Sequence, residues 1–139
     1  MPPHFKPVKG QSIYSEHLGP IHVPDKAHRD KDFFQFGITL EERHTGGRGR
    51  GHGGVTMTFL DEAMGRAASE TCQRMCVTLS MTTHFLAATH IGDFICASVK
   101  VRRRGQNIVF VDAQLHAGER LLATASGTWK NTRQPIPGR

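Results

Sequence analysis

Apolar residues recur at helical spacing within VTMTFLDEAMGRAASETC, residues 55–72. At 100° per residue these apolar positions fill one arc of about 180°, which predicts a helix with one face in the core. They are Val55, Phe59, Leu60, Ala63, Met64 and Ala67. Asp61 lies about 60° beyond the edge of that arc, so it is expected to face away from the helix's own core.

The rest of the chain alternates apolar and polar positions with a period of two, which is typical of β-strands. One such segment precedes the helix, at 33–43, and four follow it, at 75–88, 93–104, 107–118 and 120–130. Because only short turns separate the last four, the sheet is expected to be largely antiparallel, with the helix packed across one face. The pattern predicts a single α+β domain over residues 1–139.

The two ends differ from this middle part. Residues 1–32 hold most of the seven prolines and change charge often, so they are expected to be irregular apart from a short ordered piece near EHLGPIHV. Residues 132–139 form a polar tail.

Charge and cysteine content narrow the partners. The net charge of +6 favours anionic partners, such as nucleic acid, acidic lipid or a phosphate-bearing small molecule. No apolar run is long enough to span a bilayer and no secretory signal is evident, so a cytoplasmic protein is expected. The three cysteines, Cys72, Cys76 and Cys96, are odd in number and lack zinc-finger spacing, which predicts reduced thiols and no metal site.

The segment GGRGRGHGG, residues 46–54, packs six glycines, two arginines and a histidine in front of the helix. It contains GxGxxG, but the single helix followed by hairpins lacks the repeated βαβ units of a dinucleotide-binding fold. A flexible nucleic-acid contact is a second interpretation, although no aromatic residues interleave for base stacking. A plain glycine-rich connector into the helix is the third.

A more specific pattern joins His52-Gly53-Gly54 to Asp61, seven positions after Gly54, on the first turns of a lone helix. With the strands around it, this arrangement resembles the PaaI-like HotDog thioesterases, and the similarity runs from Gly19 to Trp129. The resemblance implies a sheet wrapped around one long helix. It also implies a homodimer or a dimer of dimers, with active sites at the dimer interface.

The same resemblance implies hydrolysis of an acyl-CoA thioester to a carboxylic acid and free CoA, with CoA as part of the substrate and no separate cofactor. The Gly53 N–H would stabilise the developing oxyanion at the positive end of the helix. Asp61 would activate water as a general base or attack directly as a nucleophile. Neither nucleic acid nor a membrane is expected as a partner, and the acyl group is left open.

Further residues follow from the resemblance, each with a simpler alternative. His52 would lie beside the thioester, or would merely cap the turn. Thr78 occupies a position at which relatives often carry a Ser or Thr that binds the attacking water. The simpler alternative is an ordinary strand threonine. Relatives bind CoA phosphates near a basic hairpin, and the paired N–H donors of arginine suit phosphate. The simpler alternative is a hairpin tip that only faces solvent. The hairpin residues here are Arg102, Arg103, Arg104, Gly105 and Asn107.

One position departs from the family pattern. Relatives commonly carry an Asn six residues before the histidine, and here Gly46 stands in that place. Loss of one well-placed oxyanion donor can lower the rate by about 10²- to 10³-fold. A non-catalytic protein that binds acyl-CoA or another acyl ligand is therefore an alternative to the enzyme, and nucleic-acid binding through the Gly/Arg loop is a further one.

Overall fold

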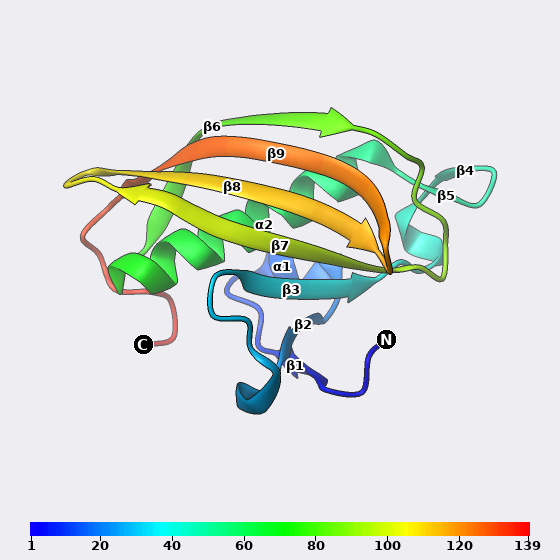
Figure 1. Cartoon of the computed structure of the whole chain (residues 1–139), viewed down its shortest axis with the longest axis horizontal. Helices are drawn as coiled ribbons and strands as arrows, with labels where there is room; N and C mark the ends of the chain where they lie inside the picture. Colours follow the sequence, from blue (N-terminus) through cyan, green and yellow to red (C-terminus); the bar gives the residue numbers. More distant parts are fainter.

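The computed structural model describes residues 1–139 and contains one seven-stranded antiparallel sheet in the order β1-β2-β3-β7-β8-β9-β6. Figure 1 shows its long strands arching over the helix α2. The strands of the sheet are β1 (Phe5–Val8), β2 (Ile21–Pro24), β3 (Phe34–Thr39), β6 (Cys76–Phe85), β7 (Phe94–Arg104), β8 (Ile108–Ala117) and β9 (Arg120–Asn131). The remaining elements are α1 (Ile13–Leu18), α2 (Gly53–Cys72), the 3-10 turns η1 (Lys26–His28) and η2 (Glu42–His44), and a hairpin of β4 (Thr45–Gly47) and β5 (Arg50–Gly51).

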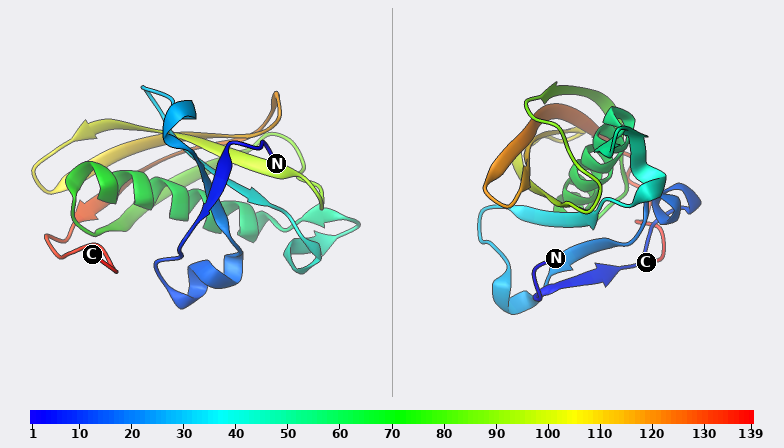
Figure 2. Two further views of the ribbon diagram at one scale, coloured as in Figure 1. Left: turned by 90° about the horizontal axis from the view of Figure 1, so that it is seen from below. Right: turned by 90° about the vertical axis from the view of Figure 1, so that its right-hand side faces the viewer.

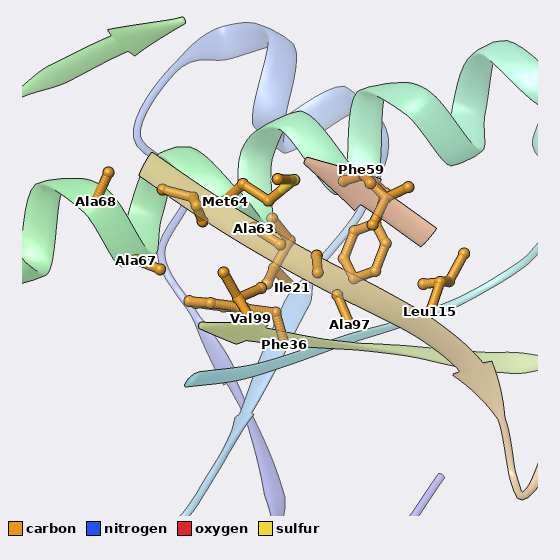
Figure 3. Packing of buried hydrophobic residues seen from close by; sticks show 14 of the residues in the cluster. Ile21, Phe36, Phe59, Ala63, Met64, Ala67, Ala68, Ala97, Val99 and Leu115 are labelled. Carbon is orange, nitrogen blue, oxygen red and sulfur yellow. The ribbon is translucent and has the colours of Figure 1, made fainter. Parts of the chain in front are cut away.

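The helix α2 is the centre of the core, as its periodicity predicts. Phe59, Ala63 and Met64 are fully buried and point toward the sheet, where Val99 and Leu115 meet them (Figure 3). Burial of such side chains is the main favourable contribution to folding, at roughly 25 cal/mol per Å² of apolar surface. The right-hand view of Figure 2 shows the sheet curling around this helix.

The predicted strands are confirmed, with the four after the helix ending within three residues of the expected bounds. β3 is shorter than the pattern suggests, because the chain turns into η2 after Leu40. Consecutive strands β7, β8 and β9 pair through short hairpins, and β6 pairs with β9, which leaves β6 at one edge of the sheet.

The expectation of irregular structure over residues 1–32 is wrong in part. β1 pairs with β2 over four residues, β2 joins β3 through His22 and Gly37, and α1 begins at a capping box formed by Ser12. Pro7 does not disrupt this pairing because β1 is an edge strand, where a missing N–H is tolerated. β1 and β2 add two antiparallel strands that extend the sheet beyond β3.

The tail 132–139 has no helix or strand, yet it is anchored to the fold. The Met75 N–H donates to the Gln134 carbonyl at 2.8 Å, and Ile136 is buried. No helix of the structure has the length and apolar character needed to cross a membrane.

Candidate active site

The hairpin β4–β5 leads directly into the N-terminus of α2, where His52 is the capping residue. Its Nδ1 accepts a hydrogen bond from the Gly54 N–H at 2.8 Å, and its own backbone N–H donates to the His44 carbonyl at 2.8 Å. A side-chain acceptor at this position satisfies one of the free N–H groups at a helix start. His52 therefore caps the turn, and its Nε2 makes no hydrogen bond within the chain.

Gly53 is the first residue of α2, so its N–H has no acceptor within the helix. The backbone there borders an open cavity of about 320 Å³ with a largely apolar wall. A Cβ added to Gly53 would point toward the Phe85 ring, 3.8 Å away, on the same side. The cavity is lined by Gly51, Gly53, Thr56, Phe85, Leu86, Ala87, Ala88, Thr89 and Leu122.

Asp61 lies half-buried on α2, off the apolar face as predicted, and Thr78 of β6 reaches it. The Thr78 hydroxyl donates to Asp61 Oδ1 at 2.5 Å. Hydrogen bonds to a carboxylate are stronger than those between neutral groups, so this contact holds the carboxylate in one orientation. The tertiary fold thus brings together two of the four expected catalytic residues.

The same helix keeps Gly53 and Asp61 apart. They are eight residues apart, which corresponds to about 12 Å along the axis at 1.5 Å per residue. A carbonyl bonded to the Gly53 N–H is therefore out of reach of the Asp61 carboxylate of the same chain. One chain holds two separated parts of the expected site.

The five residues expected to bind CoA phosphates cluster at the β7–β8 turn, at the opposite end of α2 (Figure 1). Arg102 is paired with Asp112 at 2.8 Å, and Arg104 donates to the Thr71 carbonyl at 3.2 Å. Arg103 has no ion pair. The chain does not bring this cluster to Gly53, since α2 spans about 30 Å over its 20 residues.

The turn of this basic cluster is held by backbone and side-chain bonds. The Gly105 N–H donates to the Ile108 carbonyl at 2.8 Å, and Asn107 accepts from Arg133 at 2.9 Å. Arg133 adds a further positive charge that the sequence pattern did not indicate, because it follows the end of the last predicted strand.

Other titratable groups do not form an alternative centre. Cys72, Cys76 and Cys96 are free, and burial raises the pKa of Cys76 to about 12 and that of Cys96 to about 11. Because the thiolate is the reactive form, Cys76 and Cys96 are poor nucleophiles. No group of three His, Cys, Asp or Glu side chains is placed to hold a metal ion.

Comparison with known proteins decides the family. Residues 49–124 match the model of the thioesterase superfamily, more than half of the chain. The chain belongs to the thioesterase superfamily. A candidate esterase of Pseudomonas aeruginosa is 32% identical over 132 residues, which cover 93% of this chain and 96% of that protein.

Solved structures establish the HotDog fold of this thioesterase-superfamily protein. The PaaI protein of the E. coli phenylacetic acid degradation operon matches with a TM-score of 0.75 and 21% identity, over 86% of this chain and 84% of that one. A Streptococcus pneumoniae hypothetical thioesterase solved with coenzyme A matches with a TM-score of 0.74 and 19% identity, over 95% and 98% of the two chains. The resemblance seen in the sequence is confirmed.

Gly46 is where this thioesterase-superfamily chain departs from the family pattern, and the structure gives the reason. A Cβ at Gly46 would lie 2.9 Å from His52 Cα, closer than real Cβ atoms approach backbone. An Asn at this position therefore requires the β4–β5 hairpin to move. Arg48, at the hairpin tip, and Arg50 are exposed and form no ion pair.

The residues around the small cavity beside Gly53 were not indicated by the sequence. Phe85 and Thr89 lie at or beyond the end of β6, where the alternating pattern gives no sign that the chain turns back toward α2. The Gly51 N–H donates to the Thr89 carbonyl at 3.1 Å, which fixes that loop against β5.

Proposed function

We propose that this protein is an acyl-CoA thioesterase in which Asp61 is the catalytic carboxylate and the Gly53 N–H stabilises the oxyanion. The hydrogen bond from Thr78 to Asp61 is the observation that carries the proposal, because it orients a carboxylate that the helix keeps off its own core. The family assignment supports thioester hydrolysis as the reaction class.

The chemistry follows from these groups. The thioester carbonyl oxygen accepts a hydrogen bond from the Gly53 N–H, which lies at the positive end of α2 and has no other partner. Asp61 then takes a proton from water as the water oxygen attacks the carbonyl carbon, or Asp61 attacks that carbon itself. The carbon–sulfur bond breaks, the CoA sulfur takes up a proton, and a carboxylic acid is released once water has added.

The separation of Gly53 from Asp61 requires two copies of the chain for one complete site. The outer edge of β6, which carries Thr78, is unpaired in the sheet, and Val77 and Leu79 are exposed on it. A long unpaired strand with exposed apolar residues is a template for pairing with another chain. We infer that a second copy pairs at β6 and brings its Asp61 to the first copy's Gly53.

The second candidate function is binding of an acyl-CoA without hydrolysis. Gly46 favours it, since the backbone contact at His52 leaves no room for a side-chain donor there. In this alternative the cavity beside Gly53 and the basic β7–β8 turn bind ligand, and Asp61 has no chemical role.

Release of free thiol from short, aromatic and long acyl-CoAs separates the two functions. We expect wild-type turnover to fall by about 10²- to 10⁴-fold in Asp61→Asn, the range for loss of a general base. Thr78→Val, which removes only the orienting hydroxyl, should lower kcat by about tenfold. Thr82→Val, on the outward face of the same strand, is the control.

Equal rates in wild type and Asp61→Asn would remove Asp61 from the mechanism. Thermal stabilisation by CoA without turnover of any acyl-CoA would favour the binding function, because a ligand that binds only the folded state raises its stability.

A further inference from the structure

A second cavity, of about 690 Å³, lies on the side of α2 away from Asp61 and Thr78. It is formed by the end of β1 and the chain after it, the end of β2, the segment 29–36, the tail at 137–139, and Arg66 and Glu70 of α2. None of the residues placed in thioester hydrolysis lines it. Its occupant therefore needs a separate explanation.

Arg66 is the unusual side chain of this cavity. It is nine-tenths buried, with 10% of its side chain exposed, and its Nε has no hydrogen-bond partner. Of the five N–H donors of a guanidinium, only one from Nη2 is bonded, to the Lys9 carbonyl at 3.3 Å. A buried N–H without an acceptor is costly, and Nε is too enclosed for a ligand to reach it. The terminal nitrogens are the part of the guanidinium that an anionic ligand in the cavity would contact.

The nearest acid does not satisfy Arg66. Glu62 Oε2 lies 3.7 Å from Arg66 Nε, an ion-pair distance too long for a hydrogen bond. Burial raises the pKa of Glu62, and the charge of Arg66 beside it acts in the opposite direction. Apart from the Nη2 hydrogen bond to Lys9, the contact leaves the terminal donors of Arg66 without an acceptor in the chain.

The rest of the cavity wall combines positive charge with an apolar surface. Five basic and three acidic residues line it, and one acid, Glu70, is already paired with Arg139 at 2.8 Å. Phe33, Phe34 and Phe36 supply aromatic surface beside these charges. A small cation-rich cavity with an aromatic wall suits a ligand that has an anionic head and an apolar body.

We propose that this cavity binds a small organic carboxylate, whose carboxylate is held by the Arg66 guanidinium and whose apolar body lies against Phe33 and Phe34. The planar guanidinium matches a carboxylate through two parallel hydrogen bonds, which explains why an arginine occupies this position on α2. The site is independent of the proposed hydrolysis, since the two share no residue.

Isothermal titration calorimetry of the full chain with benzoate, and with neutral benzamide, tests the site. Benzoate should bind wild type and the Asp61→Asn variant alike, and benzamide should bind at least tenfold more weakly. Arg66→Met keeps the apolar stem and removes the donors, so benzoate affinity should fall about tenfold or more. Arg74→Met makes the same charge change at an exposed position outside the cavity and should bind as wild type does.

Two further measurements keep the test decisive if Arg66→Met unfolds. Phe33→Ala alters a 40%-exposed side chain on the wall and should weaken benzoate binding several-fold without affecting the core. In NMR spectra of the wild type, benzoate should shift the amide signals of Phe33 and Phe34 and leave that of Gly53 in place.

The proposal is overturned by absence of benzoate binding, by equal affinities in Arg66→Met and Arg74→Met, or by shifts confined to Gly53 and Thr89. Inorganic phosphate binding as tightly as benzoate would overturn the assignment to an organic acid.

Discussion

Asp61 and Glu62 are adjacent carboxylates that the fold places in different surroundings. Asp61 accepts a hydrogen bond from the Thr78 hydroxyl and is half-buried on α2. The Glu62 side chain lies beside Arg66 instead. Burial is the largest effect on the pKa of Glu62 and raises it; the Arg66 charge lowers this pKa, and the Asp61 charge raises it. Neighbouring residues of the same chemical class thus have different partners, because consecutive helical positions are 100° apart.

The raised pKa of Glu62 predicts a pH dependence of stability. The folded state holds the Glu62 proton to a higher pH than the unfolded state, so this residue lowers the free energy of unfolding as pH rises from 4.5 through the raised folded-state pKa. Glu62→Gln should remove that part of the decline. Urea unfolding of both proteins from pH 4 to 7 measures it, and identical pH slopes would contradict the prediction.

At the scale of elements, the β4–β5 hairpin and the start of α2 act as one unit. Gly46 packs against the His52 backbone, His52 caps α2, and Gly53 presents a free N–H at the cavity. The two glycines therefore meet different needs. Gly46 allows a close backbone approach, whereas Gly53 has room for a Cβ and keeps the approach of a ligand open.

Alanine substitutions at the two glycines should separate these roles. Gly46→Ala forces the hairpin away from His52, and it should destabilise the fold by about 1–3 kcal/mol, the usual cost of overpacking. Gly53→Ala meets only ordinary contact with Phe85, so it should leave the melting temperature near wild type while it lowers turnover. Thermal unfolding with thiol release measures both, and unchanged stability in Gly46→Ala would show that the hairpin adapts.

At the scale of the whole molecule, the position of β6 at the sheet edge determines how a complete site can form. Thr78 faces α2 from this strand, and the outward edge of the strand is free of partners within the chain. Catalysis and assembly are therefore linked in the proposed function, since the edge that joins two copies also carries the residue that orients Asp61.

A charge on this edge should disrupt assembly. Leu79 is 52% exposed at the bulge of β6, and Leu79→Lys places a charge where a second copy would pair. We expect smaller particles in light scattering and loss of turnover together. Phe110→Lys, at an exposed position on β8 away from the edge, should change neither. A monomeric wild type with full activity would exclude the two-copy site.

The sequence by itself determined the central architecture. Helical spacing of Phe59, Ala63 and Met64 and the alternation in four later segments specify which faces are buried, because burial of apolar surface dominates folding. The His52-Gly53-Gly54 pattern with Asp61 identified the family. The pattern failed over residues 1–32, where proline content outweighed the weak signal of two four-residue strands.

Only the tertiary structure decided which side chains meet. Thr78 and Asp61 are 17 residues apart and touch because β6 returns along α2. Arg66 and Phe33 are 33 residues apart and line one cavity because the tertiary fold brings the segment 29–36 to α2. Local spacing along the chain indicates neither arrangement. The close packing of Gly46 on His52 is likewise a distance between two backbones, which hydrophobic periodicity cannot specify because it reports only which face of an element is buried.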